Sequence, residues 1–266
     1  MDFYYPGDKF PSLSVTGARC SLNCPHCGGK YLKDMVPVKT PDRLYEEAAD
    51  LSNRGGNGFL LSGGTNSEGK VPLSGYYPVL QRIKDETDLL INVHTGIPSQ
   101  EDVKRLEEAD IDVVSYDIIG DDSTIEKIYG LDLTVDDYKG GYRILKKGGV
   151  KVVPHVTVGL DEGRIKGEYR ALEIVASSEE IILNSLIPSE YGSSVSKGDF
   201  LSVTEYAVEN TDAEIIIGCM RERGRSALEI ESIELGVEGI VIPSLKTRRW
   251  AEREYDIKRI ETCCAI

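Results

Sequence analysis

Strand-like and helix-like segments alternate along this chain of 266 residues, and this alternation constrains the fold more than any other feature of the sequence. Short runs of aliphatic and β-branched residues predict eight strands, at about residues 12–16, 58–61, 89–93, 111–116, 150–158, 181–183, 213–217 and 239–242. Eight strand–helix units in this length predict an α/β fold that closes into a parallel (βα)8 barrel of the TIM type. An open doubly wound sheet gives the same local pattern. However, no Gly-x-Gly-x-x-Gly sequence follows the first strand, which counts against a dinucleotide-binding sheet.

Capping residues and glycines mark the helices between these strands. Helix starts are predicted at Thr40-Pro41, Pro78, Ser99, Thr134, residue 168, Ser202 and Ser226. At the last two, Glu205 and Glu229 follow at the spacing of a capping box, in which each side chain accepts a hydrogen bond from the other residue's backbone N–H. The barrel is expected to cover residues 1–243, and residues 244–266 to form a C-terminal tail over the barrel mouth.

Composition and charge narrow the class of protein. Hydrophobic residues make up 40% and charged residues 29% of the chain, as in a soluble globular protein. No apolar run is long enough to cross a membrane, and the first residues lack the basic and apolar regions of a signal peptide, so a cytoplasmic location is expected. A net charge of −14 argues against non-specific nucleic-acid binding, which needs basic residues. In a reducing compartment, the six cysteines would serve as metal ligands rather than disulfides.

Residues with useful chemistry recur at the C-terminal ends of the predicted strands. They are Cys20, Cys24, Cys27, Ser62, Gly63, Gly64, Thr65, His94, Asp117, His155, Ser189, Glu190, Tyr191 and Cys219. The active sites of (βα)8 barrels lie at this end of the strands. The recurrence of such residues there predicts the position of an active site.

The densest group is the loop Cys20-Ser21-Leu22-Asn23-Cys24-Pro25-His26-Cys27, which holds three cysteines. Thiolates are the ligands that iron–sulfur clusters and zinc select, and both normally take four protein ligands. Only three lie near one another in this sequence. If they hold a [4Fe–4S] cluster, one iron is free to bind a small molecule. The alternatives are a structural zinc site and a chance grouping of cysteines.

The other three cysteines are Cys219, at the end of the seventh predicted strand, and the pair Cys263-Cys264 near the end of the chain. A second cluster held by all three would explain why thiols stand in the tail, where they would otherwise be prone to oxidation. Adjacent cysteines ligate one cluster only with strain, so Cys263 and Cys264 need not both be ligands. The alternatives are a buried Cys219 that acts as a small hydrophobe and a redox-active tail pair.

The spacing of Cys20, Cys24 and Cys27 resembles that of the radical S-adenosylmethionine (radical SAM) superfamily. In that family the open iron of a [4Fe–4S] cluster chelates the amino and carboxylate groups of SAM, and the reduced cluster cleaves SAM to methionine and a 5′-deoxyadenosyl radical. Ser62-Gly63-Gly64-Thr65 resembles the family's glycine motif, which accepts hydrogen bonds from the SAM amino group.

The resemblance implies further contacts with SAM. Asp117 would accept hydrogen bonds from the ribose hydroxyls, or else cap the turn that follows it. His26 stands where the family often places an aromatic side chain near adenine. His94 and His155 would contact SAM or substrate, or else be histidines paired for structural reasons.

Nearly the whole chain resembles the biotin-synthase-like branch of this superfamily, for instance in Thr157-Val158-Gly159-Leu160 and Gly218-Cys219-Met220-Arg221. Biotin synthase has an arginine ligand to its auxiliary cluster in this last region, whereas this chain has Cys219 with several arginines close by. Ser14-Val15-Thr16-Gly17, Cys27-Gly28-Gly29 and Asn92-Val93-His94-Thr95-Gly96 are more similar to the smaller protein of the archaeal-type two-protein lipoyl synthase.

This resemblance implies a sulfur-insertion reaction. The radical would remove hydrogen from an octanoyl chain on a lysine of a lipoyl-carrier protein, and a second [4Fe–4S] cluster would supply the sulfur. The implied partners are the octanoylated carrier protein, a second, larger radical SAM protein and an electron donor such as ferredoxin. The alternatives are methylation or rearrangement of a small metabolite by another radical SAM reaction, a non-catalytic barrel stabilised by zinc, and a subunit that delivers electrons or sulfur to another enzyme.

Overall fold

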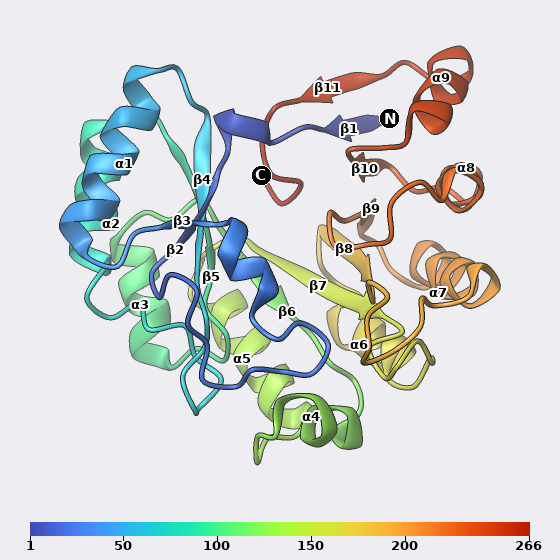
Figure 1. Cartoon of the computed structure of the whole chain (residues 1–266), viewed down its shortest axis with the longest axis horizontal. Coiled ribbons are helices and arrows are strands. Elements are labelled where there is room, and N and C mark those ends of the chain that lie inside the picture. The colour runs from blue at the N-terminus through green and yellow to red at the C-terminus, as the bar shows by residue number, and fades with distance from the viewer.

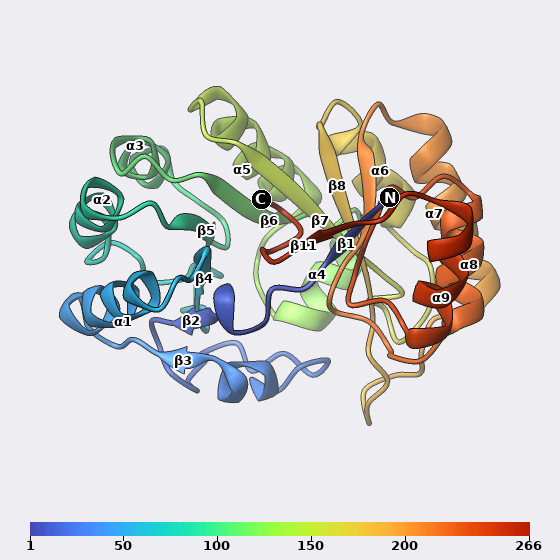
Figure 2. The same cartoon turned by 90° about the horizontal axis from the view of Figure 1, so that it is seen from above.

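The computed structural model describes all 266 residues as one curled parallel sheet with helices on its outer face (Figures 1 and 2). The strands are β1 (Asp2–Tyr4), β2 (Ser12–Ser14), β3 (Val36–Pro37), β4 (Gly58–Ser62), β5 (Leu90–His94), β6 (Val113–Asp117), β7 (Val152–Val158), β8 (Glu180–Ser185), β9 (Glu214–Ile217), β10 (Gly239–Val241) and β11 (Lys258–Ile260). The helices are α1 (Pro41–Asn53), α2 (Tyr77–Glu86), α3 (Gln100–Glu108), α4 (Asp122–Tyr129), α5 (Val135–Lys147), α6 (Glu168–Val175), α7 (Lys197–Asn210), α8 (Ser226–Glu234) and α9 (Leu245–Glu254). Two 3-10 turns, η1 (Gly7–Lys9) and η2 (Lys30–Asp34), precede β2 and β3.

The strand order is β11-β1-β10-β9-β8-β7-β6-β5-β4-β2-β3. The eight predicted strands correspond to β2 and to β4 through β10, so the prediction of a parallel α/β fold with eight strand–helix units is confirmed. The prediction that the barrel closes is wrong. The short strand β1 pairs with β10, and β3 pairs with β2. The sheet therefore ends in two separate edge strands, β11 and β3. The sheet is therefore a curled half-barrel.

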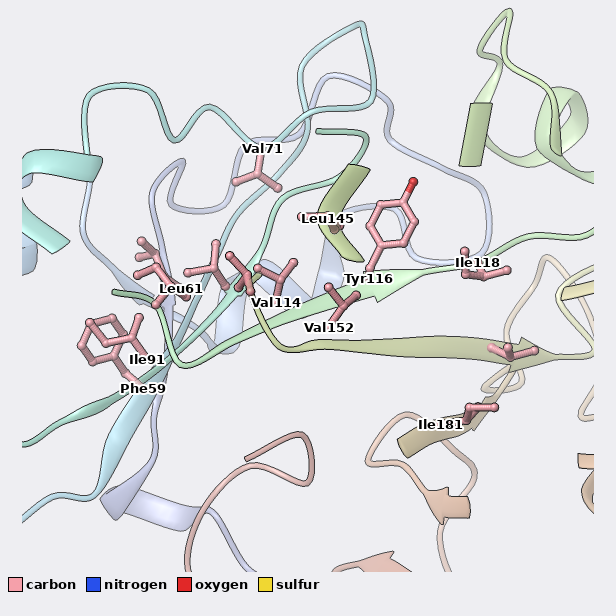
Figure 3. Close-up of a cluster of buried hydrophobic side chains, with 14 of the residues drawn as sticks. Phe59, Leu61, Val71, Ile91, Val114, Tyr116, Ile118, Leu145, Val152 and Ile181 are labelled. Carbon is pink, nitrogen blue, oxygen red and sulfur yellow. The ribbon is translucent and has the colours of Figure 1, made fainter. Parts of the chain in front are cut away.

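Alternate strand positions face opposite sides of the sheet, because successive side chains of a strand point to opposite faces. Leu61 of β4, Ile91 of β5 and Val114 of β6 are fully buried and pack with Leu145 of α5 in the core between sheet and helices (Figure 3). Burying a side chain of this size contributes about 1.5–3 kcal/mol to stability. The intervening positions face the concave side of the sheet, where Asn92 and other polar residues lie.

Most helix starts agree with the predicted caps. The Thr40 hydroxyl accepts from the backbone of Arg43 at 3.2 Å, and α3 and α5 begin with capping boxes at Ser99 and Thr134. The pair Ser202 and Glu205 does not start a helix. These residues lie inside α7, which begins earlier because Ser196 and Asp199 have the same spacing and form the cap.

The start of α8 at Ser226 was predicted, but its capping box is absent. The Glu229 carboxylate is buried and accepts from the Arg221 guanidinium at 2.8 Å and from the Thr247 hydroxyl at 2.6 Å. Glu229 therefore forms a tertiary ion pair instead of the helix cap that the local sequence pattern predicted. The helices α4 and α9 were not predicted.

The tail adds α9 and β11 before it turns inward. Glu261 forms an ion pair with Lys9 at 2.6 Å and accepts from Asn57 at 2.9 Å through its carbonyl, and these two partners precede β2 and β4. The last residues lie inside the curl of the sheet in both views (Figures 1 and 2). Cys264 and Ala265 pack there on Tyr4 and on strand residues of β6 to β10. The tail therefore enters the curl from the N-terminal side of β2 and β4 and does not cover the end that carries the Cys20–Cys27 loop.

Candidate active site

A cavity of about 240 Å³ lies at the C-terminal ends of β2, β4, β5 and β6. The predicted residues that line it are Cys20, Cys24, His26, Cys27, Gly63, Gly64, Thr65, His94 and Asp117. They come from four separate strand ends, as expected for an active site of a parallel α/β sheet. We name this cavity the SAM pocket after the ligand that the resemblance implies; it brings together most of the residues that the sequence singled out.

The cysteine loop follows β2 and is folded by residues with left-handed backbone conformations. Asn23 has φ 45°, and Gly28 and Gly29 have φ 53° and 68°. The carbonyl of Cys24 accepts from the N–H groups of Cys27 and Gly28 at 3.1 and 2.7 Å, which makes a tight turn that brings the second and third thiols together. A tight turn of this kind explains why these two cysteines are only three residues apart.

The three thiols influence one another's protonation. Hydrogen bonding with the Cys24 thiol lowers the pKa of Cys27 to about 6, and the same pairing, with burial, raises that of Cys24. Burial works to raise the pKa of Cys20, but the backbone N–H of Asn23 and the Thr65 hydroxyl outweigh it, so the pKa is lowered. Paired thiols that share a proton suit thiolate coordination, because a metal takes the place of the proton.

The spacing of the thiols bears on the kind of metal site. No three His, Cys, Asp or Glu side chains of this chain are grouped around one point as a single metal ion requires. In a [4Fe–4S] cluster each thiolate binds a different iron, so its sulfur atoms stand further apart than around one ion. Three thiols on one loop suit a cluster with one open iron as well as the zinc site that the sequence left open.

Gly64 allows the turn after β4 to touch the cysteine loop. A Cβ atom at this position would lie 2.0 Å from the carbonyl oxygen of Arg19 and 2.6 Å from Cα of Cys20, so only glycine fits. The N–H of Gly64 donates to the Thr16 hydroxyl at 2.7 Å, and Ser21 donates to the carbonyl of Thr65 at 2.9 Å. The glycine motif thus fixes the loop as well as lining the cavity.

The carbonyl oxygens of Gly63 and Gly64 accept no hydrogen bond from the protein, although both residues line the SAM pocket. Free carbonyls of this kind suit the amino group that the glycine motif binds in the resemblance stated above. Ser62 does not line the pocket, and its carbonyl accepts from Val15 at 2.9 Å within the sheet. A contact of Ser62 with SAM stays a prediction.

His26 presents a neutral ring to the SAM pocket. Burial, aided by the charge of Lys30, lowers its pKa to about 4. The ring packs edge-on against Tyr129 at 5.9 Å and Tyr191 at 6.4 Å between centroids, and its Nδ1 is buried without a partner. An uncharged ring held between two tyrosines suits stacking on a flat ligand, as predicted for adenine.

His94, Asp117 and His155 lie on the concave face of neighbouring strands. Asp117 pairs in register with His155, and the rings of His94 and His155 meet edge-on at 5.2 Å. His94 and Asp117 line the SAM pocket, but His155 does not; it is partly buried beside His94, and its buried Nε2 atom has no partner. Burial and the charge of His94 lower the pKa of His155, so its ring is neutral at pH 7. Contact of His155 with SAM stays a prediction.

Several residues of this region were not singled out by the sequence. Tyr129 and Tyr138 line the SAM pocket, and Thr16 orients its glycine turn. Asn92 is fully buried and donates to the hydroxyl of Ser115, another pocket residue, at 2.9 Å. One signal could have found Asn92: it stands two positions before His94 on a strand, so both side chains must face the same side of the sheet.

The remaining cysteines meet inside the curl. The charge of a Cys263 thiolate acts on both Cys219 and Cys264, and Cys263 Sγ accepts from Asn92 Nδ2 at 3.3 Å. Cys264 is buried, Cys263 is partly buried, and Cys219 is exposed to solvent even though burial raises its pKa. The three thiols therefore lie in one part of the curl, with Cys263 bonded to Asn92, although they are not grouped around one point.

Two arginines, Arg221 and Arg223, bind the backbone around Cys219; Arg221 is buried and Arg223 is exposed. Arg221 pairs with Glu229 at 2.8 Å and donates to the carbonyls of Gly218 and Val241, at the ends of β9 and β10. Arg223 donates to the carbonyl of Cys219 at 3.0 Å. The arginines noted in the sequence near Cys219 thus bind strand ends.

Comparison with known proteins identifies the class. The family model of the radical SAM superfamily matches residues 14–164, more than half of the chain, so the chain belongs to this superfamily. Biotin synthase of Citrifermentans bemidjiense is 25% identical over 199 residues, which cover 70% of this chain and 59% of biotin synthase. Membership brings a [4Fe–4S] cluster and SAM as cofactors, for which the residues of the SAM pocket are suited.

Solved structures support the fold. The crystal structure of HydG, a maturase of the [FeFe]-hydrogenase, matches with a TM-score of 0.67 at 17% identity, over 91% of this chain and 56% of HydG. Methylornithine synthase (PylB) matches with a TM-score of 0.60 at 13% identity, over 90% of this chain and 71% of PylB. The chain thus spans little more than half the length of biotin synthase and of HydG. No helix of the chain has the length and apolar character needed to span a membrane.

Proposed function

We propose that this radical SAM enzyme inserts sulfur into an octanoyl chain that is attached to a lysine of a lipoyl-carrier protein, as in lipoyl cofactor biosynthesis. One observation carries the proposal. Cys219 and the pair Cys263-Cys264 are far apart in the sequence but lie near enough in the curl for their charges to interact, and this supports a second [4Fe–4S] cluster held by them. A sulfur-insertion reaction gives these three thiols a common role as ligands of the cluster that supplies the sulfur.

Cys263, in the group formed by Cys219, Cys263 and Cys264, is linked to the SAM pocket through two side chains. Cys263 accepts from Asn92 at 3.3 Å, Asn92 donates to Ser115 at 2.9 Å, and Ser115 lines the pocket. A substrate that reaches this layer would have the SAM site on one side and the sulfur source on the other. When bound, the first cluster and SAM supply the radical, and the second cluster supplies the sulfur.

The residues of the chain would hold and orient these groups. The free carbonyls of Gly63 and Gly64 would accept from the SAM amino group, Asp117 from its ribose hydroxyls, and the neutral ring of His26 would lie beside adenine. Of the tail pair, Cys263 is the ligand that we favour, because Cys264 is buried among apolar side chains of the strands.

The proposal includes partners. The octanoylated carrier protein presents the substrate, a second, larger radical SAM protein completes the second insertion, and a ferredoxin-type donor supplies electrons. The similarity to biotin synthase supports the branch of the superfamily but not the substrate.

Anaerobic reconstitution tests the proposal. Iron and acid-labile sulfide are counted for the wild type, for the variant C20A/C24A/C27A and for the variant C219A/C263A/C264A. About eight iron atoms in the wild type and about four in each variant are expected, since each cluster holds four. About four in the wild type and in the tail variant would contradict a second cluster and with it the sulfur-insertion proposal.

The polarity of the interior favours a second candidate, a radical reaction on a small polar metabolite. His155 Nε2 and Asn92 Oδ1 are buried without partners near the SAM pocket, and buried polar atoms are normally satisfied by a ligand or water. An octanoyl chain offers no polar group along its length. Stimulation of SAM cleavage by an octanoyl-lysyl peptide would favour the first candidate, and its absence despite two clusters would favour the second.

A further inference from the structure

Asn92 of β5 joins two parts of the curl through one nitrogen atom. Its side chain is fully buried, and its Nδ2 donates to the Ser115 hydroxyl at 2.9 Å and to Cys263 Sγ at 3.3 Å. Ser115 lines the SAM pocket, whereas Cys263 belongs to the tail. The hydroxyl at the pocket and the thiol of the tail are therefore no further apart than these two hydrogen bonds together.

The orientation of the Asn92 amide suits a sulfur atom that carries no proton. A protonated thiol can donate to an amide oxygen, yet Asn92 Oδ1 is buried without a partner and the amide nitrogen is the atom bonded to Cys263. When iron takes the place of the thiol proton, the sulfur can only accept, and N–H groups are the partners that it needs. The arrangement therefore fits an iron-bound Cys263.

Asn92 also provides the only hydrogen bond between residues 262–266 and the rest of the chain. Within this segment the bonds are local, since the Thr262 hydroxyl and the Ile266 N–H both donate to the carbonyl of Cys263. Cys264 and Ala265 are held by apolar packing, which is not directional. The direction of the Cys263 thiol thus depends on Asn92.

We propose that Asn92 is a positioning residue for sulfur delivery, which holds Cys263 as a ligand of the second cluster and favours the reduced form of that cluster. In the insertion step, the carbon radical of the substrate and one sulfide form a C–S bond. The electron that this bond formation releases passes to iron, which is reduced by one electron. A donor to the ligand sulfur stabilises the added negative charge and so favours this step. The inference rests on the function proposed above.

A redox titration tests the effect on the cluster. In the background C20A/C24A/C27A the loop cluster is absent, so electron paramagnetic resonance observes the second cluster alone. Asn92→Leu keeps the branched shape of the side chain but has no donor. At a fixed potential, the ratio of reduced to oxidised cluster should fall about tenfold, the effect of one lost hydrogen bond to a charged group. An unchanged ratio at about four iron atoms would overturn the proposal.

Asn184→Leu is the matched control for this titration. Asn184 of β8 is also buried, and its Oδ1 accepts from the backbone N–H of Met220 at 3.3 Å, next to Cys219, but its side chain binds no thiol. Its replacement disturbs packing beside Cys219 without the loss of an N–H···S bond. An equal fall of the ratio in both variants would show that packing sets the potential, which overturns the inference.

Alkylation of the protein without clusters tests the positioning role separately. Iodoacetamide labels the free thiols, and peptide mass spectrometry follows the rate at Cys263. Asn92→Leu should raise this rate about fivefold or more, because a tail that loses its anchor leaves the curl more often. Asn184→Leu should leave the rate unchanged. Equal rates in the wild type and in Asn92→Leu would overturn the positioning role.

The outcomes separate this inference from the sulfur-insertion proposal. If C20A/C24A/C27A with Asn92 intact binds no iron, the second cluster is contradicted, and sulfur insertion and this role of Asn92 fall together. If it binds about four iron atoms and Asn92→Leu changes neither the redox ratio nor the labelling, only this inference falls. If Asn92→Leu loses the circular dichroism of the folded protein, Asn92→Ala replaces it, with the same expected results.

Discussion

The two groups of thiols are built in opposite ways. Cys20, Cys24 and Cys27 stand on one loop, where the backbone turn at Cys24 alone brings two of them together. Cys219 and Cys263 come from chain segments separated by two helices and two strands. The Cys219 carbonyl is bound by Arg223, and the Cys263 thiol by Asn92. A local site is preorganised by its own loop, whereas an assembled site is only as stable as the packing around it. The two groups should therefore respond differently to mutation.

Removal of the thiols should give the largest effect and the clearest separation. The variant C20A/C24A/C27A is expected to lose all cleavage of SAM, because the iron that binds SAM is no longer held. The variant C219A/C263A should still form 5′-deoxyadenosine but yield no sulfur-containing product. Chromatography of both products checks this. A tail variant that loses SAM cleavage as completely as the loop variant would contradict the division of roles.

The assembled site should be sensitive to its buried ion pair. In Glu229→Gln, Arg221 keeps its charge in a buried position without a counter-charge, which costs about 3–5 kcal/mol. Denaturant unfolding of the protein without clusters measures the loss. Reconstituted Glu229→Gln should lose iron from the Cys219 site first, because Arg221 holds the ends of β9 and β10.

A matched control is Glu252→Gln, which removes an ion pair of the same chemistry with Arg259 on the exposed surface of α9. Exposed pairs contribute about 0–1 kcal/mol, so little change is expected. Equal losses in the two variants would show that burial does not set the contribution of these pairs.

The local site should be sensitive to the contact at Gly64. In Gly64→Ala, the new Cβ would collide with the Arg19 carbonyl at 2.0 Å, so the loop must shift at a cost of about 1–3 kcal/mol. Iron content at the loop should fall while that at the tail cysteines is kept.

The control for this variant is Gly140→Ala in α5. No atom lies within 4 Å of the added methyl group, and alanine favours the helix, so stability should rise by about 0.5–1 kcal/mol. Urea unfolding of both proteins gives the comparison. A loss of stability in Gly140→Ala similar to that in Gly64→Ala would contradict the steric explanation.

The smallest effect is expected from the cap of α4, the helix whose Ile125 packs against Cys24. Asp121 accepts from the backbone of Thr124 at 2.7 Å, and Asp121→Ala should cost about 0.5–2 kcal/mol. Burial works to raise the pKa of Asp121, but hydrogen bonds from Ser123 and Thr124 outweigh it and lower the pKa to about 2.

The sign of the pH dependence follows from this lowered pKa. Asp121 in the unfolded chain titrates near pH 3.9, so the unfolded chain takes up this proton first as the pH falls. The stabilisation by Asp121 is complete above about pH 4 and is lost toward about pH 2. Chemical unfolding from pH 6 to 3 should show a difference between wild type and Asp121→Ala that shrinks at low pH. A constant difference would contradict the assignment.

The sequence by itself determined the local features. Eight strands and most helix starts followed from apolar periodicity and from capping residues such as Ser99, because these signals act within a few residues. The cysteine loop and the glycine motif could be recognised for the same reason: all their residues stand in one short segment. The position of His94 and Asp117 in the SAM pocket followed from the rule that polar residues at parallel strand ends converge.

Only the tertiary structure decided the rest, because it depends on segments far apart in the chain. The sheet stays open because β1 and β3, too short to be noticed in the sequence, take the edges that closure would need. Glu229 forms an ion pair with Arg221 instead of capping α8. Contacts of the tail with Lys9 and Asn57 direct it into the curl and not over the barrel mouth. Local patterns determine the individual elements, but the pairing of distant elements determines where Cys219, Cys263 and Cys264 come together.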